Sequence, residues 1–190
     1  SSINENPSEI VKSIAGMNPD IAAISVYIWN ASIVKKILPE LKKILPSLTV
    51  VIGGPEVSYN HDEWLKLHPE IDYIIAGAGE AAFRKVALSG FERNHGLLNV
   101  PNPHFRDIPF PYDDSEMKRL AGKLIYYESS RGCPFRCSYC LSSRSDQNLQ
   151  FRDLQQVESE LDFFKFHKPS LVKFVDRTFN SRRDHYRPVW

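Results

Sequence analysis

Three cysteines within eight residues are the part of this sequence with the clearest chemical potential. Cys133, Cys137 and Cys140 are the only cysteines of the 190-residue chain, and they follow the pattern Cys-x-x-x-Cys-x-x-Cys. An odd number of close thiols does not suit a disulfide framework, and buried, inert cysteines would not be expected to gather in one loop. Thiolates on one short loop can instead converge on a soft metal centre. The sequence therefore predicts a metal-binding loop here.

Two kinds of metal centre fit such a loop. Iron–sulfur clusters are held by cysteine thiolates, and a 4Fe–4S cubane held by only three cysteines keeps one iron available for another ligand. Zinc is the alternative, because sites with three cysteines and one histidine exist. The nearest histidines in the sequence, His104 and His167, are far from the loop. The cluster is therefore the favoured interpretation, and a three-cysteine zinc protein is the less favoured one.

Strands and helices are expected to alternate in the first half of the chain. A cap at Asn6 followed by Pro7 predicts the start of a helix. Near-continuous apolar runs predict buried parallel strands, and 3.6-residue periodicity predicts helices. The expected strands cover 21–28, 48–52 and 71–75, and the expected helices cover 31–45, 61–67 and 80–88. This order favours an α/β fold with a doubly wound, Rossmann- or flavodoxin-like parallel sheet. Pro39 predicts a kink or restart in its helix.

Each of the three expected strands ends in residues suited to a ligand site. The strand ends are Ser25-Val-Tyr27, Gly53-Gly54-Pro55-Glu56 and Gly77-Ala-Gly79-Glu80. Ligands of parallel sheets bind outside the carboxyl ends of the strands, and glycine lets a bulky ligand approach the backbone. No GxGxxG pattern follows a strand, so a dinucleotide is not indicated. Taken alone, these glycine turns also fit any flavodoxin-like domain.

The second half of the chain has the order of a barrel's first units. A proline-rich linker precedes an expected strand at 124–127, the cysteine loop, an amphipathic helix at 152–166 and a strand at 171–175. This order is that of a (β/α) barrel, whose active site lies at the carboxyl face. The cysteine loop and the segment Asp176–Asn180 are therefore expected on the same face.

The cysteine loop resembles the cluster loop of radical S-adenosylmethionine (radical SAM) enzymes. The resemblance rests on the cysteine spacing, on Tyr139 just before the last cysteine, and on the Ser130-Arg131-Gly132 turn after a strand. It implies that the three cysteines ligate a 4Fe–4S cluster whose open iron binds S-adenosylmethionine. It also implies that Tyr139 packs near the adenine and that Asp176 lies near the methionine moiety. Loop packing for Tyr139, and a helix cap or an ion pair for Asp176, are the alternatives.

The first half resembles the cobalamin-binding domain that precedes the catalytic domain in one class of radical SAM proteins. Tyr27 replaces a common leucine, and Ala78 replaces a common glutamate. The histidine loop that supplies a lower cobalt ligand in many cobalamin proteins has no counterpart here. By this resemblance, the cobalamin-binding residues are Ser25, Tyr27, Gly53, Gly54, Pro55, Glu56, Gly77, Gly79 and Glu80.

The expected domain organisation follows from both halves. Residues 1–92 would form a cobalamin-binding-like Rossmann domain without its first strand–helix unit, 93–120 a linker, and 121–190 the start of a radical SAM partial barrel. The chain would then be a fragment, and a partner chain or an oligomer could complete the fold. A net charge of +1 and a hydrophobic fraction of 42% indicate neither nucleic acid nor a membrane as partner. Clustered reduced thiols and the lack of a signal peptide favour the cytoplasm.

The expected function is that of this class of enzyme. The parent protein would cleave S-adenosylmethionine reductively for radical chemistry, with methyl transfer through cobalamin as one outcome. The cofactors would be the 4Fe–4S cluster, S-adenosylmethionine and cobalamin. The sequence does not identify the substrate. Activity of the 190-residue chain by itself is not expected. The alternative is a non-catalytic, truncated module for cofactor binding or interaction.

Overall fold

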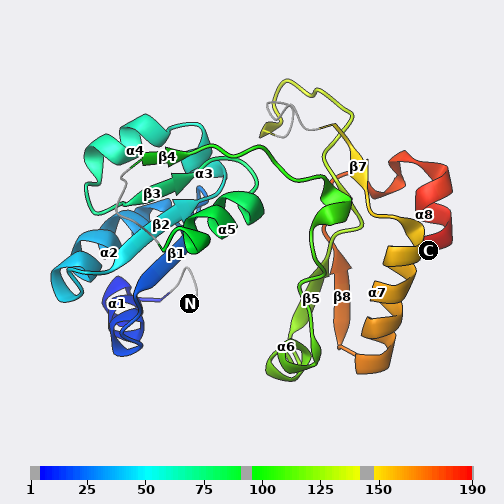
Figure 1. The fold of residues 1–190 in the computed structure, drawn as a ribbon, viewed down its shortest axis with the longest axis horizontal. Helices are drawn as coiled ribbons and strands as arrows, with labels where there is room; N and C mark the ends of the chain where they lie inside the picture. Colours follow the sequence, from blue (N-terminus) through cyan, green and yellow to red (C-terminus); the bar gives the residue numbers. More distant parts are fainter. Residues whose placement is uncertain (1–4, 91–95, 142–147, 190) are drawn as a thin grey trace. The chain divides into compact units, whose positions relative to one another are not determined.

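The structure, a computed structural model, has two compact units. It describes residues 5–90, 96–141 and 148–189, and the chain divides into residues 1–102 and residues 103–190. Each unit has its own β-strands (Figure 1). Each also has its own hydrophobic core. The expected linker therefore does not stand apart: its residues 93–95 lie outside the described ranges, and residues 103–120 belong to the second unit.

The first unit contains a parallel sheet of four strands. Its order is β1-β2-β3-β4, with every neighbouring pair parallel. The register aligns Ser25 of β1 with Gly53 of β2, and Gly53 with Ile75 of β3, so three strands end at one edge. The strands are β1 (Ile21–Ser25), β2 (Thr49–Gly53), β3 (Tyr73–Ile75) and β4 (Gly96–Leu98).

Helices cover both faces of this sheet. Alternate residues of β2 point to opposite faces: Val50 and Ile52 belong to one core with the first four helices, whereas Val51 packs with Ala82 and Val86 of α5. The doubly wound α/β fold is confirmed. The helices are α1 (Pro7–Gly16), α2 (Ala31–Ile44), α3 (Pro55–Ser58), α4 (His61–Leu67) and α5 (Glu80–Leu88).

Local chemistry explains where several of these elements begin and end. The Asn6 side chain accepts a hydrogen bond from the Ser8 amide at 3.0 Å and so caps α1. Strand β1 is shorter than its apolar run, because Asn30 accepts from the Tyr27 amide at 2.8 Å and donates to the Ser25 carbonyl at 2.9 Å, which turns the chain. Helix α2 continues through Pro39 to Ile44.

A second, smaller set of elements forms the second unit. β5 and β8 pair in parallel, with Tyr127 opposite Phe174, and β6 and β7 pair antiparallel. The strands are β5 (Leu124–Tyr127), β6 (Ser130–Arg131), β7 (Gln150–Phe151) and β8 (Leu171–Phe174). The helices are η1 (Phe105–Asp107), α6 (Asp114–Arg119), α7 (Leu154–His167), η3 (Phe179–Ser181) and α8 (Arg183–Val189). The order of β5, cysteine loop, α7 and β8 is the predicted one.

Aromatic side chains dominate the core of the second unit. Phe164 of α7 lies edge-on to Phe110, Tyr112 and Tyr127, with ring centroids 5.3–5.7 Å apart. Such edge-to-face pairs are favourable beyond the area they bury. The Tyr112 hydroxyl also donates to the Tyr126 carbonyl at 2.6 Å. Residues 103–112 are therefore packed against the sheet and α7.

The helices within the described ranges are all short. The longest, α2 and α7, have 14 residues each, whereas crossing a bilayer takes about 20 apolar residues. Among the described residues, no helix is long and apolar enough to span a membrane.

Candidate functional site

Hydrogen bonds join the loops at the carboxyl edge of the first sheet. The Val26 amide, just after β1, donates to the Gly53 carbonyl at 2.7 Å, and the Glu56 amide donates to the Val26 carbonyl at 3.3 Å. The predicted residues Ser25, Gly53 and Glu56 therefore lie at one place in the fold. Strand pairing alone would bring the strand ends together, and these bonds also fix the loops that follow.

At Gly54 the loop after β2 approaches the loop after β1 closely. The backbone of Gly54 has φ +104° and ψ 173°, a region that is essentially restricted to glycine. A Cβ at this position would lie 2.6 Å from the Val26 carbonyl oxygen. The glycine is thus required by the approach of one loop to another, a role that the sequence alone did not indicate.

Ser58 joins the second loop to the third and was not among the predicted residues. Its hydroxyl donates to the Gly54 carbonyl at 2.8 Å and accepts from the Gly77 amide at 3.2 Å. A serine four residues after the glycine turn, at the end of a one-turn helix, is the signal that could have identified it.

Open space and exposed apolar side chains surround this edge. A Cβ at Gly79 would meet no atom within 4 Å, and one at Gly77 would meet only Asn102 Oδ1 at 4.0 Å. Tyr27 stacks on Trp29 with centroids 4.5 Å apart and planes 7° apart, and Ile28 is 80% exposed. Backbone without side chains next to exposed apolar groups fits a large, partly apolar cofactor such as cobalamin.

In the second unit, the short β6–β7 pair closes the base of the cysteine loop. Arg131 pairs with Gln150, and Ser130 pairs with Phe151. Gly132 follows with φ +99°, and a Cβ there would lie 2.9 Å from the Asn148 carbonyl oxygen. The two ends of the loop therefore approach as closely as backbone allows.

The three cysteines are the less exposed residues of the loop that leaves this base. Cys133, Cys137 and Cys140 are half-buried, whereas the five residues between them are exposed, Tyr139 at 91%. The Cys140 amide donates to the Cys137 carbonyl at 3.0 Å, which forms a tight turn, and none of the three forms a disulfide. Three thiols in one short loop fit a cluster by the chemistry of their donor atoms. Within the described residues, no group of three or more potential ligands is already arranged around a metal position.

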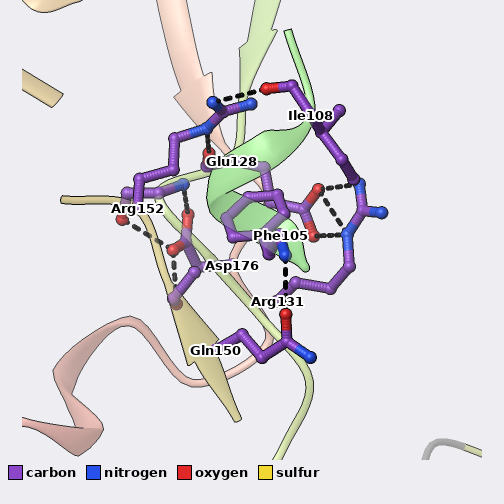
Figure 2. Close-up of polar contacts among 9 residues, drawn as sticks. Phe105, Ile108, Glu128, Arg131, Gln150, Arg152 and Asp176 are labelled. Carbon is purple, nitrogen blue, oxygen red and sulfur yellow. Dashed lines mark hydrogen bonds and ion pairs between the residues drawn. The ribbon is translucent and has the colours of Figure 1, made fainter. Parts of the chain in front are cut away.

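Asp176 joins the ends of β5 and β8. Its carboxylate accepts from the Ser129 amide at 3.1 Å, the Ser129 hydroxyl at 2.7 Å and the Ser130 hydroxyl at 2.6 Å (Figure 2). The N-cap of the following η3 is Thr178, so Asp176 does not cap that helix. The structure thus places Asp176 beside the start of the cysteine loop, as predicted, with its oxygens bound to the chain itself.

The second unit also contains a buried ion pair between Arg152 and Glu160. Arg152 and Glu160, both 5% exposed, form an ion pair at 3.2 Å, and the Tyr127 hydroxyl donates to Glu160 at 2.7 Å. Burial first, and then the hydrogen bond to Glu160, raise the pKa of Tyr127 well above its usual value. The phenol stays protonated and holds α7 against β5. No local sequence pattern predicts this pairing of helix and strand.

His185 of α8 is fully buried against the β6–β7 pair. Its ring lies 4.6 Å from that of Phe151, and its Nε2 is 3.4 Å from the Ser129 hydroxyl. Burial, and secondarily the charge of Arg182, lower the pKa of this histidine. A neutral imidazole therefore supports the base of the loop from the side of α8.

Comparison with known proteins agrees with both halves of this description. Residues 2–87 match the family model described as "B12 binding domain". The first unit is therefore a cobalamin-binding type of domain, followed by a unit with the opening order of a (β/α) barrel.

Curated relatives match most of the chain. The 2-(S-pantetheinyl)-carbapenam-3-carboxylate methyltransferase of Streptantibioticus cattleyicolor is 28% identical over 85% of this chain and 28% of its own length. The cobalamin-dependent radical SAM methyltransferase TokK of Streptomyces tokunonensis is 27% identical over 86% of this chain and 28% of its own. An uncharacterized methyltransferase of Pyrococcus horikoshii is 29% identical over 90% of this chain and 42% of its own. The chain thus spans between about a quarter and two fifths of these relatives.

A solved structure has the same fold. The radical S-adenosylmethionine methyltransferase TsrM from Kitasatospora setae superposes with a TM-score of 0.66 at 18% identity, covering 97% of this chain and 42% of TsrM. Along most of its length the chain is thus similar to radical SAM methyltransferases, and its first unit matches a B12 binding domain.

Proposed function

We propose that this chain is the cofactor-binding part of a methyltransferase that uses cobalamin, S-adenosylmethionine and a 4Fe–4S cluster. The observation that carries the proposal is the loop of three half-buried cysteines at the carboxyl ends of β5 and β8, in one chain with a B12 binding domain. TokK is a cobalamin-dependent radical SAM methyltransferase and TsrM is a radical S-adenosylmethionine methyltransferase, which supports methyl transfer as the reaction.

Each predicted residue then has a role in binding or orientation. Cys133, Cys137 and Cys140 would hold the cluster as thiolates. The turn at Gly53–Gly54 and the open backbone at Gly77–Gly79 would receive cobalamin, and the adjoining Ser25, Tyr27, Pro55, Glu56 and Glu80 would line that site. When bound, these groups would supply reductive cleavage of S-adenosylmethionine and a carrier for the methyl group.

Tyr139 and Asp176 would contribute to the site for S-adenosylmethionine and the cluster. Tyr139 is fully available to pack on an adenine ring, because it is 91% exposed. Asp176 would act by fixing Ser129 and Ser130 at the start of the cysteine loop, since its oxygens already bind these serines. Both assignments can be tested separately from cluster binding.

Anaerobic reconstitution of the full chain with iron and sulfide tests the cluster. We expect about four irons and four sulfides per chain, and loss of both in Cys137→Ala. Phe135→Ala is the matched control, because Phe135 is an exposed residue of the same loop. Uptake of zinc without sulfide would overturn the proposal and favour a zinc site.

The alternative of a non-catalytic module needs its own experiment. The reconstituted chain is incubated with dithionite and S-adenosylmethionine, and 5′-deoxyadenosine and S-adenosylhomocysteine are measured. Release of either product supports an enzyme. A loaded cluster without any product supports a module that binds cofactors and acts only with further protein. Titration with hydroxocobalamin, followed by absorbance, tests the first unit in the same preparation.

A further inference from the structure

One aromatic residue of the segment before β5 touches both ends of the cysteine loop. Phe105 lies in residues 103–112, which we name the strap, and it is only 1% exposed. The guanidinium groups of Arg131 and Arg152 each lie 4.8 Å from its ring centroid. Its amide donates to Gln150 Oε1 at 2.7 Å. Figure 2 shows Phe105 between the two arginines, with Gln150 below.

The two arginines are held in place by partners of their own. Arg131 forms an ion pair with Glu128 at 2.7 Å, and Arg152 forms one with Glu160 at 3.2 Å. Arg152 also donates to the carbonyls of Ile108 at 3.0 Å and Glu128 at 3.2 Å. Each of the two arginines that contact the ring thus has its charge balanced by one carboxylate. Cation–π contacts are stronger when they are desolvated, and here Arg152 is 5% exposed and Arg131 is 24% exposed.

These contacts meet at the base of the cysteine loop. Arg131 and Gln150 are opposite each other across the β6–β7 pair, and Cys133 lies only two residues beyond Arg131. The Phe105 ring and amide therefore bind one residue from each strand of the pair. Because the pair has only two residues per strand, its own hydrogen bonds give it little independent stability.

We propose that Phe105 is a positioning residue for the iron–sulfur cluster: it clamps Arg131 and Gln150 together and thereby fixes the geometry of the cysteine loop. The inference rests on the proposed cluster site. It gives the strap, which is the first segment of the second unit, a role in the environment of the metal centre. Phe105 acts through the β6–β7 pair and touches neither cluster nor substrate.

The test compares two strap aromatics in the full chain. Phe105→Leu keeps an apolar side chain and removes the ring face. Phe110→Leu is the matched control, because it makes the same change in the same segment. Phe110 packs on Tyr112, Phe163 and Phe164 instead of on the two arginines. The readouts are iron and sulfide content, the rate of iron loss to a chelator, the electron paramagnetic resonance spectrum of the reduced cluster, and exchange of the Arg152 amide.

We expect Phe105→Leu to bind iron and sulfide but to lose iron about tenfold faster than wild type. A tenfold change corresponds to a free-energy difference of ~1.4 kcal/mol. Its reduced cluster should give a mixed spectrum with more than one species. The Arg152 amide, which donates to the Ser129 carbonyl at 3.0 Å, should exchange about tenfold faster. Phe110→Leu should match wild type in iron loss and spectrum even where its melting temperature falls.

The outcomes separate this inference from the proposed function. If wild type takes up no iron and sulfide, both fail. If wild type loads fully and the two leucine variants behave alike, only the positioning role fails. Gln150 provides a second pair of variants should Phe105→Leu not fold: Gln150→Met removes the acceptor and should speed iron loss, and Gln150→Glu keeps the acceptor and should restore the wild-type rate. Equal rates in these two variants would overturn the inference.

Discussion

Replacing Gly54 by alanine should destabilise the first unit strongly. At φ +104° and ψ 173°, a non-glycine residue costs about 1–3 kcal/mol of backbone strain. The new Cβ would also lie 2.6 Å from the Val26 carbonyl oxygen and 3.0 Å from the Val26 amide nitrogen. Both atoms are backbone, so relief requires the loop after β1 to move, at a further cost of about 1–3 kcal/mol. The expected loss is therefore about 2–6 kcal/mol, out of the 5–15 kcal/mol typical of a domain.

Urea unfolding of the full chain, followed by tryptophan fluorescence, measures this loss. Trp64 is 4% exposed in the core of the first unit and reports on its unfolding. Gly16→Ala is the control, because a Cβ there meets no atom within 4 Å and alanine suits a helix better by about 0.5–1 kcal/mol. A Gly54→Ala midpoint equal to that of wild type, or to that of Gly16→Ala, would refute the reasoning from loop approach.

Three further predictions concern separate parts of the molecule. Gly79→Ala should leave the free energy of unfolding in urea within about 0.5 kcal/mol of wild type, because its Cβ enters open space. It should weaken hydroxocobalamin binding in an absorbance titration; unchanged binding would place the cofactor elsewhere. Tyr127→Phe should cost about 1–3 kcal/mol in thermal unfolding, because it leaves a buried Glu160 oxygen without its donor, whereas exposed Tyr126→Phe should cost nothing. Since burial lowers the pKa of His185, its contribution to stability is complete above about pH 6.5 and is lost as the pH falls below it; His185→Gln should therefore show a smaller loss of urea midpoint between about pH 7.5 and pH 5.5 than wild type.

Elements with strong local signals were predicted well from the sequence. Helices α4 and α5 and strand β5 have the predicted bounds, because a glycine or asparagine turn stands before each helix and a short run of apolar and aromatic residues marks the strand. Strand β1 was predicted three residues too long. Ile28 continued the apolar run, but it is 80% exposed, because Asn30 folds the chain back through two side-chain hydrogen bonds.

Contacts between distant parts of the sequence could not be predicted in this way. Phe105 meets Gln150 across 45 residues and Ser129 meets Asp176 across 47, and nothing in either local pattern specifies the partner. Asp176 was predicted at the correct strand end, since the ends of parallel strands coincide. Its serine partners depend on side-chain geometry that strand order does not determine.

The hydroxyl of Ser58 has a consequence for the order in which a ligand engages the first sheet. It holds the loop after β2 and the loop after β3 at once, through Gly54 and Gly77. Once a cofactor has immobilised either loop, the other has lost part of its freedom as well, so the second set of contacts forms at a smaller entropic cost. Two regions of one cofactor would therefore bind cooperatively through a single oxygen atom that need not touch the cofactor at all.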